Sequence, residues 1–429
     1  MNIIDELVAT VALPRMLPVR QLFADERIGD VAAVVRGEIA RPEIAARLRP
    51  GMSVAVGVGS RGVAELPRLV RATIAALEAH GARPFIVPAM GSHGGATAEG
   101  QTALLAKLGV TEESAGCPIR SSMETVEMGR LPGGLPIYMD SAAMAADGIV
   151  VINRIKPHTS FSGTIESGLA KMITIGLGKQ RGAESCHAYG FGTMAEHVIE
   201  MARFKLAHAP VLFGLATVEN AYDKPALIEA VPGERILERE PELLAMARAN
   251  MPRIRFRPLD VLVIDRMGKE FSGTGMDPNI TGRATTPYVR TSQEVGKMAV
   301  LDLSDNGGGN ATGIGLADVC TRRLFDRIDF PSTYANCITS TVLAGARIPM
   351  ILDNDRDAIR VAIKTCNAQG PGGLRMVRLA NTLHLEEILI SEALLPEAMA
   401  DPGIEVLGDP RPMAFDAAGN LARPVSSHG

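Results

Sequence analysis

A strand, a glycine-rich turn, a helix and a second strand follow one another between residues 52 and 88. The apolar run at 52–57 predicts a buried strand, and residues 65–80 predict a helix that a glycine ends. The run at 83–88 predicts the next strand. Because a helical crossover joins parallel neighbours in one sheet, this unit predicts an α/β fold with a mainly parallel sheet flanked by helices.

In the first half of the chain, polar residues lie in loops that follow the expected strands. Another apolar run, at 148–153, predicts a third strand. Ligands of open α/β sheets bind at the carboxyl ends of the strands. We therefore expect loops 57–62, 89–97 and 153–163 to gather at one edge of the sheet and to form a site there.

The chain is long enough for two domains. Its 429 residues exceed a typical single core, and a second strand-led series begins at 259–265. We expect an N-terminal cofactor-binding α/β domain at 1–253, a C-terminal α/β domain at 254–408 and a loose tail at 409–429. Each domain is expected to contain a mainly parallel sheet flanked by helices, with the active site in the interdomain cleft.

Composition argues against several classes of partner. A net charge of −4, aromatic residues at 4% and the absence of tryptophan argue against nucleic-acid binding. The acidic N-terminal segment does not have the pattern of a signal peptide, and no apolar run reaches the length of a membrane span. A cytoplasmic protein without a membrane partner is therefore expected. The five cysteines contain no Cys-x-x-Cys pair, which supports neither a zinc knuckle nor a disulfide framework.

The turn after the first strand has the pattern Gly-x-Gly-x-x-Gly. Between a strand and a helix, such a loop can hold a phosphate on the backbone amides at the start of the helix. A dinucleotide site would also need an acid at the end of the next strand, and the strand at 83–88 ends in proline instead. The loop therefore predicts a cradle for a mononucleotide, and a glycine-rich turn without a ligand is the alternative. The cofactor-binding residues expected here are Gly57, Gly59, Ser60, Arg61 and Gly62.

One weakly charged segment, 153–187, contains a lysine and two histidines. Lys171 lies within an apolar run at 169–175, where an ammonium is costly and a neutral amine can act as a nucleophile or a covalent anchor. His158 and His187, on either side of it, supply what proton transfer or metal binding needs. The alternative is an interfacial lysine whose head reaches solvent, beside two ordinary histidines.

Further residues of the same half could join this site or compete with it. His93, in the loop after the second strand, is expected at the same edge, and a solvated loop histidine is the alternative. Lys179, in a glycine-rich stretch that could bind an anion, is expected to stay charged in a polar setting. A zinc site is another alternative, although its spacing matches no common set of zinc ligands. Its ligands would be His187, His197 and Glu184 or Glu200.

A loop in the second half has the composition of a substrate-binding loop. It follows the strand expected at 259–265 and combines glycines, hydroxyl groups and charged side chains. Lysine or arginine can pair with a carboxylate, and asparagine or threonine can bind hydroxyl groups. A surface turn is the alternative. The expected substrate-binding residues are Lys269, Asn279, Thr281 and Arg283.

Over most of its length the chain resembles the nickel-dependent lactate racemase family, most sharply between residues 89 and 187. The first stretch resembles the family's Gly-x-His loop with a threonine and a glutamate downstream. The residues that carry this are Gly91-Ser92-His93, Thr97 and Glu99. The second stretch resembles the family's series of a histidine, a glycine- and serine-rich stretch, a lysine and a further histidine. Here these are His158, Ser162-Gly163, Lys171 and His187.

The resemblance implies a nickel pincer nucleotide cofactor, a pyridinium-3,5-bisthiocarboxylate mononucleotide nickel that is covalently attached to Lys171 through a thioamide. It implies that two sulfurs and a carbon of the cofactor hold the nickel and that His187 is the protein ligand. It also implies that His93 and His158 are paired acid/base residues on opposite faces of the substrate carbon. Hydride would pass to the cofactor and return on the other face.

The function implied by the resemblance is that of an isomerase, a racemase or epimerase that inverts C2 of a 2-hydroxyacid. Its partners would be a small 2-hydroxy carboxylate substrate and cofactor-assembly enzymes, and a homo-oligomer is possible. A Schiff-base lyase that uses Lys171, with Glu166 as the close carboxylate, is one alternative. A non-catalytic nucleotide or phosphate binder that uses the loop at 57–62 is the other.

Two loops depart from the family's pattern. The family's first loop usually has Ser-Asp and then Thr-Arg-Pro, where this chain has Ser60-Arg61-Gly62-Val63. The family's substrate loop has Tyr-Gln and a lysine, where this chain has Thr281-Gly282 and Thr285. A smaller and more polar loop that also contains Arg283 favours a polyhydroxy (sugar) acid over lactate as the substrate.

Overall fold

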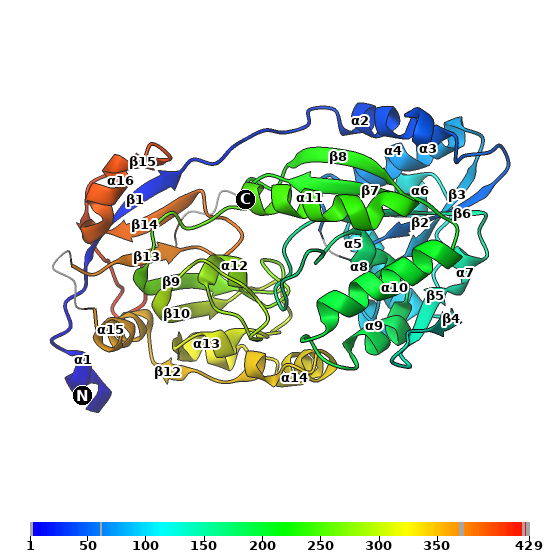
Figure 1. Cartoon of the computed structure of the whole chain (residues 1–429). Coiled ribbons are helices and arrows are strands. Elements are labelled where there is room, and N and C mark those ends of the chain that lie inside the picture. The colour runs from blue at the N-terminus through cyan, green and yellow to red at the C-terminus, as the bar shows by residue number, and fades with distance from the viewer. Residues whose placement is uncertain (1–2, 61, 369–372, 423–424, 426–429) are drawn as a thin grey trace. The chain divides into compact units, whose positions relative to one another are not determined.

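The computed structural model describes residues 3–60, 62–368, 373–422 and 425 (Figure 1). The chain divides into two compact units. Residues 24–251 form the first, here called the N-terminal unit; residues 1–23 and 252–429 form the second, here called the C-terminal unit. No helix among the described residues has the length and apolar character needed to cross a membrane.

The N-terminal unit is built on a five-stranded sheet in the order β3-β2-β6-β7-β8. Its four parallel strands are β2 (Ser53–Val58), β3 (Arg83–Pro88), β6 (Gly148–Arg154) and β7 (Val211–Glu219). β8 (Pro225–Pro232) closes one edge in the antiparallel direction. With α4 (Leu66–Ala79) between β2 and β3, the strand-helix-strand unit and the mainly parallel sheet expected from the sequence are confirmed.

Two apolar cores cover the two faces of this sheet. Side chains of a strand alternate between its faces, and on β2 Val54 and Val56 belong to one core while Ala55 belongs to the other. The first core includes residues of α2 (Val31–Ile39) and α4. The second includes Leu169 and Ile173, so the segment that carries Lys171 packs directly against the sheet.

The remaining elements of the N-terminal unit are shorter or lie outside the sheet. The helices are α3 (Pro42–Ala45), α5 (Ala98–Lys107), α6 (Glu112–Ala115), α7 (Ser141–Met144), α8 (Leu169–Lys171), α9 (Lys179–His187), α10 (Met194–His208) and α11 (Ile236–Asn250). The single turns are η1 (Gly94–Ala96), η2 (Met172–Gly176) and η3 (Gly233–Arg235), of which η2 is π-helical. A separate hairpin pairs β4 (Thr125–Arg130) with β5 (Pro136–Asp140).

The C-terminal unit is built on a nine-stranded sheet. Five neighbouring strands run parallel: β12 (Met350–Leu352), β11 (Val319–Thr321), β10 (Val295–Leu303), β9 (Leu259–Met267) and β13 (Met376–Leu379). The antiparallel side consists of β14 (Glu387–Ser391), β1 (Arg15–Gln21), β15 (Ile404–Val406) and β16 (Arg411–Pro412). Helix α15 (Asp355–Thr365) packs through Ile359 and Ala362 on a core with Val261 and Val263 of β9.

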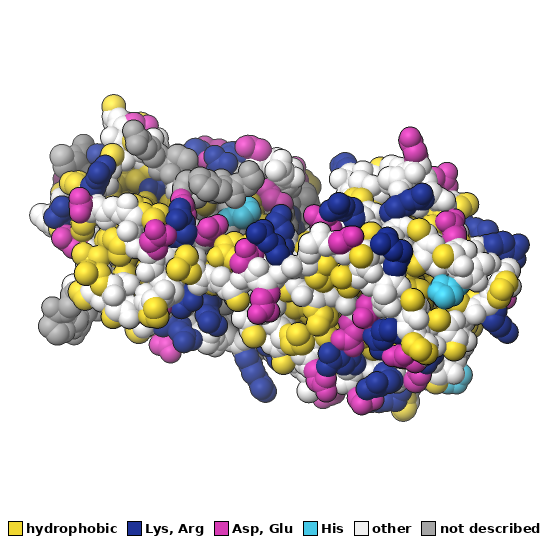
Figure 2. All heavy atoms as spheres, turned by 90° about the horizontal axis from the view of Figure 1, so that it is seen from above, with side chains coloured by type: hydrophobic (Ala, Val, Ile, Leu, Met, Phe, Trp, Pro, Cys, Tyr) yellow, Lys and Arg dark blue, Asp and Glu magenta, His cyan; other side chains and the backbone are white. Residues whose placement is uncertain are grey.

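The other elements of the C-terminal unit are short helices and turns around this sheet. They are α1 (Ile3–Val8), α12 (Pro278–Thr281), η4 (Ile314–Leu316), α13 (Arg322–Asp326), α14 (Phe330–Thr339), η5 (Leu343–Ala346), η6 (Glu392–Leu394) and α16 (Leu395–Ala400). Lys and Arg side chains are interspersed with Asp and Glu on the face of the molecule drawn in Figure 2. Such mixed charge is typical of the solvent-facing surface of globular proteins.

The first strand of the chain belongs to the C-terminal unit. β1 pairs with β14, with Leu17 opposite Ile390, and on its other side with β15, with Gln21 opposite Ile404. The expectation that 1–253 form one domain is therefore wrong for the first 23 residues, because backbone hydrogen bonds hold β1 inside the other sheet. The chain passes from the N-terminal to the C-terminal unit between Met251 and Pro252, close to the expected boundary.

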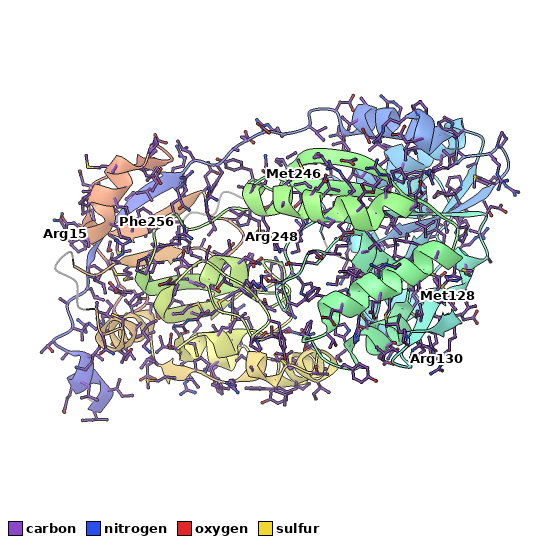
Figure 3. The ribbon with its side chains drawn as sticks, in the orientation of Figure 1. Arg15, Met128, Arg130, Met246, Arg248 and Phe256 are labelled. Atoms are coloured by element: carbon purple, nitrogen blue, oxygen red, sulfur yellow. The ribbon has the colours of Figure 1, made fainter. Side chains whose placement is uncertain are left out.

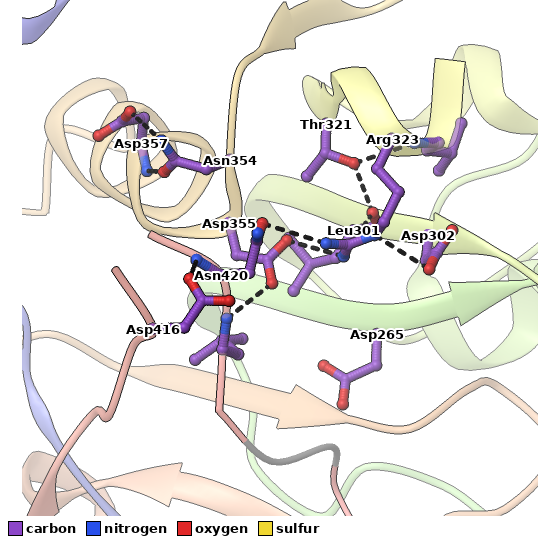
Figure 4. Close-up of polar contacts among 12 residues, drawn as sticks. Asp265, Leu301, Asp302, Thr321, Arg323, Asn354, Asp355, Asp357, Asp416 and Asn420 are labelled. Carbon is purple, nitrogen blue, oxygen red and sulfur yellow. Dashed lines mark hydrogen bonds and ion pairs between the residues drawn. The ribbon is translucent and has the colours of Figure 1, made fainter. Parts of the chain in front are cut away.

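The end of the chain is tied to the C-terminal unit rather than loose. β16 pairs with β1, the amide of Leu421 donates to Asp355 Oδ2 at 2.9 Å, and the amide of Val425 donates to Asp265 Oδ2 at 2.9 Å. Arg323 donates to Asp355 and to the side chain of Asn420 (Figure 4). The expectation of a loose tail is wrong over these residues, because buried carboxylates bind the backbone of the tail.

Candidate active site

Loops from three strands meet at one edge of the sheet in the N-terminal unit. β2, β3 and β6 are parallel neighbours, so their carboxyl ends lie together. A Cβ added to Gly59 would lie 2.7 Å from Cε of Met172, so the loop after β2 packs closely on this side chain. The amide of Gly91 donates to the carbonyl of Gly176 at 3.1 Å. The loops after β2 and β3 therefore both contact the segment that carries Lys171.

The expected phosphate cradle forms only in part. Gly57 lies inside β2 and is packed against Val151, Ala89 and Leu177, so it serves the sheet rather than a ligand. Gly62 has open space around it, and α4 begins only at Leu66, so the amides of this helix do not directly follow the glycine loop. Arg61 lies outside the described residues. Gly59 and Ser60 are the cradle residues that the structure brings to the Lys171 segment and to His93.

Lys171 ends the short helix α8 and directly precedes the π-helical turn η2. Its chain neighbours Ala170 and Met172 are buried, but Lys171 itself is only half-buried. Lys171 is thus more exposed than the residues on either side of it. Turns of π-helix are rare and are frequent at functional sites. The charge of Lys171 is one cause of a lowered pKa at His187, which places the amine near that imidazole.

The backbone fixes which ring nitrogen carries the proton in His187, the last residue of α9. Its Nδ1 lies 2.7 Å from the carbonyl oxygen of Ala183. A carbonyl can only accept, so Nδ1 carries the proton and Nε2 of the neutral ring keeps its lone pair. Burial lowers the pKa of His187, and the charge of Lys171 lowers it further. A neutral imidazole held through Nδ1–H is the form in which histidine binds metals.

His158 is held in the opposite tautomer. The backbone amide of Ser160 lies 3.0 Å from its Nδ1. Because an amide N–H can only donate, Nδ1 accepts and Nε2 of the neutral ring carries the proton. The ring of His158 packs against Phe161 in a tilted arrangement, with centroids 4.4 Å apart, and its centroid lies 6.2 Å from that of Phe191. Phe191 also contacts His187 edge-on at 5.6 Å, so the two histidines share one aromatic wall.

A buried carboxylate fixes the loop that carries His158. Glu166 is 1% exposed, and its Oε2 accepts from the amide of His158 at 2.6 Å. Its Oε1 accepts from the amide of Gly163 at 2.8 Å and from the guanidinium of Arg248. Arg248 comes from α11, where Figure 3 labels it. These contacts occupy Glu166, so it is a positioning residue for His158.

His93 is exposed but anchored on two sides. Its Nδ1 shares a hydrogen bond with the hydroxyl of Ser60. The side-chain amide of Gln101, in α5, donates to the carbonyl of Gly91 at 2.9 Å and to that of His93 at 3.3 Å. A hydroxyl can either donate or accept, so His93 can change tautomer without losing its anchor. Its loop is thereby held against η2 and α9, in contact with Ile175 and Ala183.

Lys179 is not the polar, anion-binding lysine that the glycine-rich stretch suggests. It is fully buried and forms an ion pair with the equally buried Asp140, with Nζ 3.3 Å from Oδ2. Its Nζ also donates to the carbonyl of Pro88 and, at 3.1 Å, to Gln101 Oε1. Lys179 therefore supports the loop of His93 through Gln101. The expectation that Lys179 belongs to an anion-binding loop is wrong, because its ammonium is buried and Asp140, distant in sequence, supplies its counter-charge inside the fold.

Two expected substrate residues in the C-terminal unit remain near a cluster of polar groups. Lys269 Nζ donates to the carbonyl of Gly273 at 2.6 Å and to the side chain of Asn336. Thr312 donates to the same amide oxygen at 3.1 Å. Asn279 is half-buried, and its side chain donates to Asp277 at 2.9 Å.

The other two expected substrate residues are used inside the unit. Thr281 is fully buried, and its hydroxyl donates to the carbonyl of Arg283. The guanidinium of Arg283 pairs with Asp318 and donates to the carbonyls of Leu316 and Gly296. These contacts give Arg283 a structural role in this loop, and its binding of a substrate carboxylate stays a prediction.

Metal chemistry at this site would rest on one protein ligand. Among the described residues, no group of three or more His, Cys, Asp or Glu side chains is arranged to hold a metal ion. The alternative zinc site at His187, His197 and Glu184 or Glu200 is therefore not formed. All five cysteines are free, which agrees with the absence of a disulfide framework.

Several functional candidates escaped the sequence analysis. Phe161 and Phe191 form the aromatic wall, and Lys205 and Glu240 are buried charges that contact the backbone around Lys171. Lys205 and Glu240 lie in helices whose pattern resembles any amphipathic helix. Among the residues that position the site, only Glu166 stands out in the sequence, because it is an acid within a weakly charged stretch.

Comparison with known proteins identifies the part of the chain that carries this site. Residues 24–198 match the family model described as the lactate racemase N-terminal domain. The match begins where the N-terminal unit begins and includes His93, His158, Lys171 and His187. No curated protein sequence matches the chain significantly.

Two solved structures are similar at low identity. One is a protein from Thermotoga maritima determined by a structural genomics consortium, with a TM-score of 0.47 and 14% identity over 80% of this chain and 92% of that chain. The other is the lactate racemase apoprotein from Thermoanaerobacterium thermosaccharolyticum, with a TM-score of 0.44 and 14% identity over 82% of this chain and 91% of that chain. Over residues 24–198 the chain is thus similar to the N-terminal domain of the lactate racemase family.

Proposed function

We propose that this chain is a 2-hydroxyacid racemase or epimerase that inverts C2 by proton-coupled hydride transfer with a nickel pincer nucleotide attached to Lys171. The observation that carries the proposal is the pair of opposite histidine tautomers beside this lysine. Ser160 leaves the proton on Nε2 of His158, and Ala183 leaves the lone pair on Nε2 of His187. One ring is thus prepared to donate a proton and the other to bind a metal.

The residues present fit such a cofactor. His187 offers a single neutral nitrogen, and no cluster of further protein ligands is found among the described residues, so a metal here would need ligands from a cofactor. Lys171 is half-buried near that nitrogen and can form an amide-type bond. Gly59 brings the backbone of its loop against Met172, the residue next to Lys171.

In this proposal the cofactor supplies a hydride acceptor, and the protein moves the proton of the substrate hydroxyl. His93 can take that proton on Nε2 while its Nδ1–H donates to Ser60. His158 carries a proton on Nε2 that it can give to the substrate oxygen from the opposite side. Glu166 and Gln101 hold the two loops, so that both rings keep their positions during turnover.

The substrate class rests on the residues of the C-terminal unit. We favour a polyhydroxy acid because Lys269, Asn336 and Thr312 form a group of polar atoms that can bind a carboxylate and hydroxyls. The sequence predicts that this group faces the histidines across an interdomain cleft, and this stays a prediction. The roles of cofactor-assembly enzymes and of a second copy of the chain as partners also stay predictions.

The decisive experiment is the intact mass and nickel content of protein produced together with cofactor-assembly enzymes. Wild type is expected to carry the adduct, Lys171→Ala to lack it, and Lys107→Ala, an exposed lysine in the same unit, to keep it. Loaded wild type should then exchange the C2 hydrogen and invert C2 of at least one member of a panel of 2-hydroxyacids. An adduct that persists in Lys171→Ala would reject the proposed anchor.

The same experiment separates the two alternatives. A Schiff-base lyase would trap substrate on Lys171 with borohydride in the absence of metal, although the close carboxylate, Glu166, is occupied by Arg248 and the His158 loop. A non-catalytic nucleotide binder would keep its function when His93, His158 and His187 are all replaced by alanine. Either result would overturn the proposal.

A further inference from the structure

The turn that follows Lys171 is held by a buried lysine from another helix. In η2 the amide of Leu177 donates to the carbonyl of Met172 at 2.9 Å, the five-residue spacing of a π-helix. Lys205, from α10, donates through Nζ to the carbonyls of Ile173 at 2.8 Å and Thr174 at 2.9 Å. The ammonium thus binds the carbonyl end of the segment 169–174.

The other end of the same segment is held by a buried glutamate. Glu240, from α11, accepts from the amide of Ala170 at 2.8 Å, and its carboxyl also interacts with the amide of Leu169. The preceding residue must be glycine, since a Cβ on Gly168 would lie 2.1 Å from Glu240 Oε1. Lys171 therefore stands between a carboxyl that binds amides and an ammonium that binds carbonyls.

Both groups are costly to bury. Lys205 and Glu240 are each 1% exposed, and among the described residues neither forms an ion pair. Burial lowers the pKa of Lys205 to about 7 and raises the pKa of Glu240 to about 7. A core that needed only packing would use apolar side chains of the same size. The two side chains instead match the polarity of the short helical segment, with a hydrogen-bond acceptor at its amide end and a donor at its carbonyl end.

We propose that Lys205 and Glu240 are positioning residues that fix the backbone on both sides of Lys171 and so direct its amine toward His187. We call this pair the backbone clamp. The inference rests on the proposed function of Lys171 as the cofactor anchor, and it adds two residues from helices that follow His187 in the chain. Neither residue needs to touch the cofactor or the substrate.

The test compares Lys205→Met and Glu240→Leu, which remove the clamp, with Glu240→Gln, which keeps an acceptor for the amides of α8. Leu69→Ala, in the core on the opposite face of the sheet, is the control for a general loss of stability. Two quantities are measured: hydrogen exchange of the amides of 170–177 in protein without cofactor, and the rate of adduct formation by intact mass.

We expect exchange of these amides to rise, and adduct formation to slow, by about tenfold or more in the two clamp-removing variants, because each loses hydrogen bonds to a charged group. Glu240→Gln should show exchange of these amides and a rate of adduct formation close to those of wild type. Leu69→Ala should change neither, even with an equal loss of Tm. Wild-type rates of adduct formation in Lys205→Met, or unchanged exchange at 170–177, would overturn the clamp. If wild type forms no adduct, the proposed function fails, and the exchange measurement still tests the clamp.

Discussion

At the scale of single residues, the chemistry of this site is set by main-chain atoms as much as by side chains. The carbonyl of Ala183 and the amide of Ser160 give His187 and His158 opposite tautomers. A sequence cannot show this, because it depends on which backbone atom each ring meets. What the sequence did show was the set of rings and the amine, since histidine and a lysine in an apolar run are rare enough to stand out.

Replacing Glu166 should impair catalysis more than binding. Glu166→Ala leaves the amides of His158 and Gly163 without their acceptor, so the imidazole can drift from its working position. We expect kcat of loaded enzyme to fall by about 100-fold, as for a displacement of ~1 Å, with a smaller change in KM. Steady-state epimerisation measures this.

Arg248→Gln, which affects the ion pair of Glu166 but keeps its carboxylate, is the control for Glu166→Ala. Arg248→Gln removes a guanidinium that is 46% exposed but leaves the carboxylate and its two amide contacts. Its kcat should stay within a few-fold of wild type. A loss as large as that of Glu166→Ala would mean that Arg248, rather than the contacts to the loop, is decisive.

Stability should depend on pH through Glu240. Its pKa in the folded protein is raised to about 7 by burial, so the fold favours the neutral acid. The stability that this provides is complete below the ordinary pKa and is lost as the pH rises to about 7. The free energy of unfolding of Glu240→Gln minus that of wild type should therefore rise by ~3 kcal/mol between about pH 4.5 and 7.5. Urea unfolding at several pH values measures this difference, and a flat difference would contradict the raised pKa.

At the scale of elements, the loop of His93 depends on one helix. Gln101 in α5 joins the carbonyls of Gly91 and His93 to the buried ammonium of Lys179. Gln101→Leu removes these contacts and leaves polar groups buried without partners. We expect a loss of ~2–4 kcal/mol in the free energy of unfolding, read by thermal or urea denaturation. Replacing the adjacent exposed residue, Thr102→Ala, should lower the free energy of unfolding far less. Equal losses in the two variants would argue against the role of Gln101 in holding this loop.

Elements with a strong local pattern were predictable. The strands β2, β3, β6 and β9 were recognised because apolar runs of the right length end at glycine or polar residues. The π-helical turn η2 and the β4–β5 hairpin were not expected. The first has no signal of its own in the residues 172–176, since it depends on Lys205, which lies on a distant helix.

Contacts distant in sequence account for the remaining errors. Lys179 reads as polar because its neighbours are glycines, and its partner Asp140 is in another element. The sequence suggests that Arg283 is a free cation, yet Asp318 and three backbone carbonyls accept hydrogen bonds from it. In each case the residue type was noticed and its role was set by a partner that only the fold brings near.

At the scale of the whole molecule, the two units differ in how they are encoded. The N-terminal unit uses one continuous stretch, 24–251, whereas the C-terminal unit needs residues 1–23 as well as 252–429. β1 lies within the sheet of the latter, with β14 on one side and β15 and β16 on the other. The active-site residues expected in the first half all belong to the continuous unit.

This difference predicts unequal behaviour of fragments. Residues 24–251 should fold alone, with cooperative unfolding by circular dichroism and dispersed amide signals by NMR. Residues 252–429 alone should aggregate, because loss of β1 exposes strand edges on β14 and β15. Supplying the peptide 1–23 in trans should restore solubility. A well-folded fragment 252–429 without that peptide would contradict the prediction.

The position of β1 also has a consequence for synthesis on the ribosome. Arg20 of β1 pairs with Glu387 of β14, 367 residues later in the chain. At ~5–20 residues per second, β1 waits roughly 20–70 s for its partner strand. During that time the whole of 24–251 emerges and can fold. The newborn polypeptide therefore spends most of its translation with Met16, Leu17 and Val19 uncovered, which makes this stretch a natural binding site for a ribosome-associated chaperone.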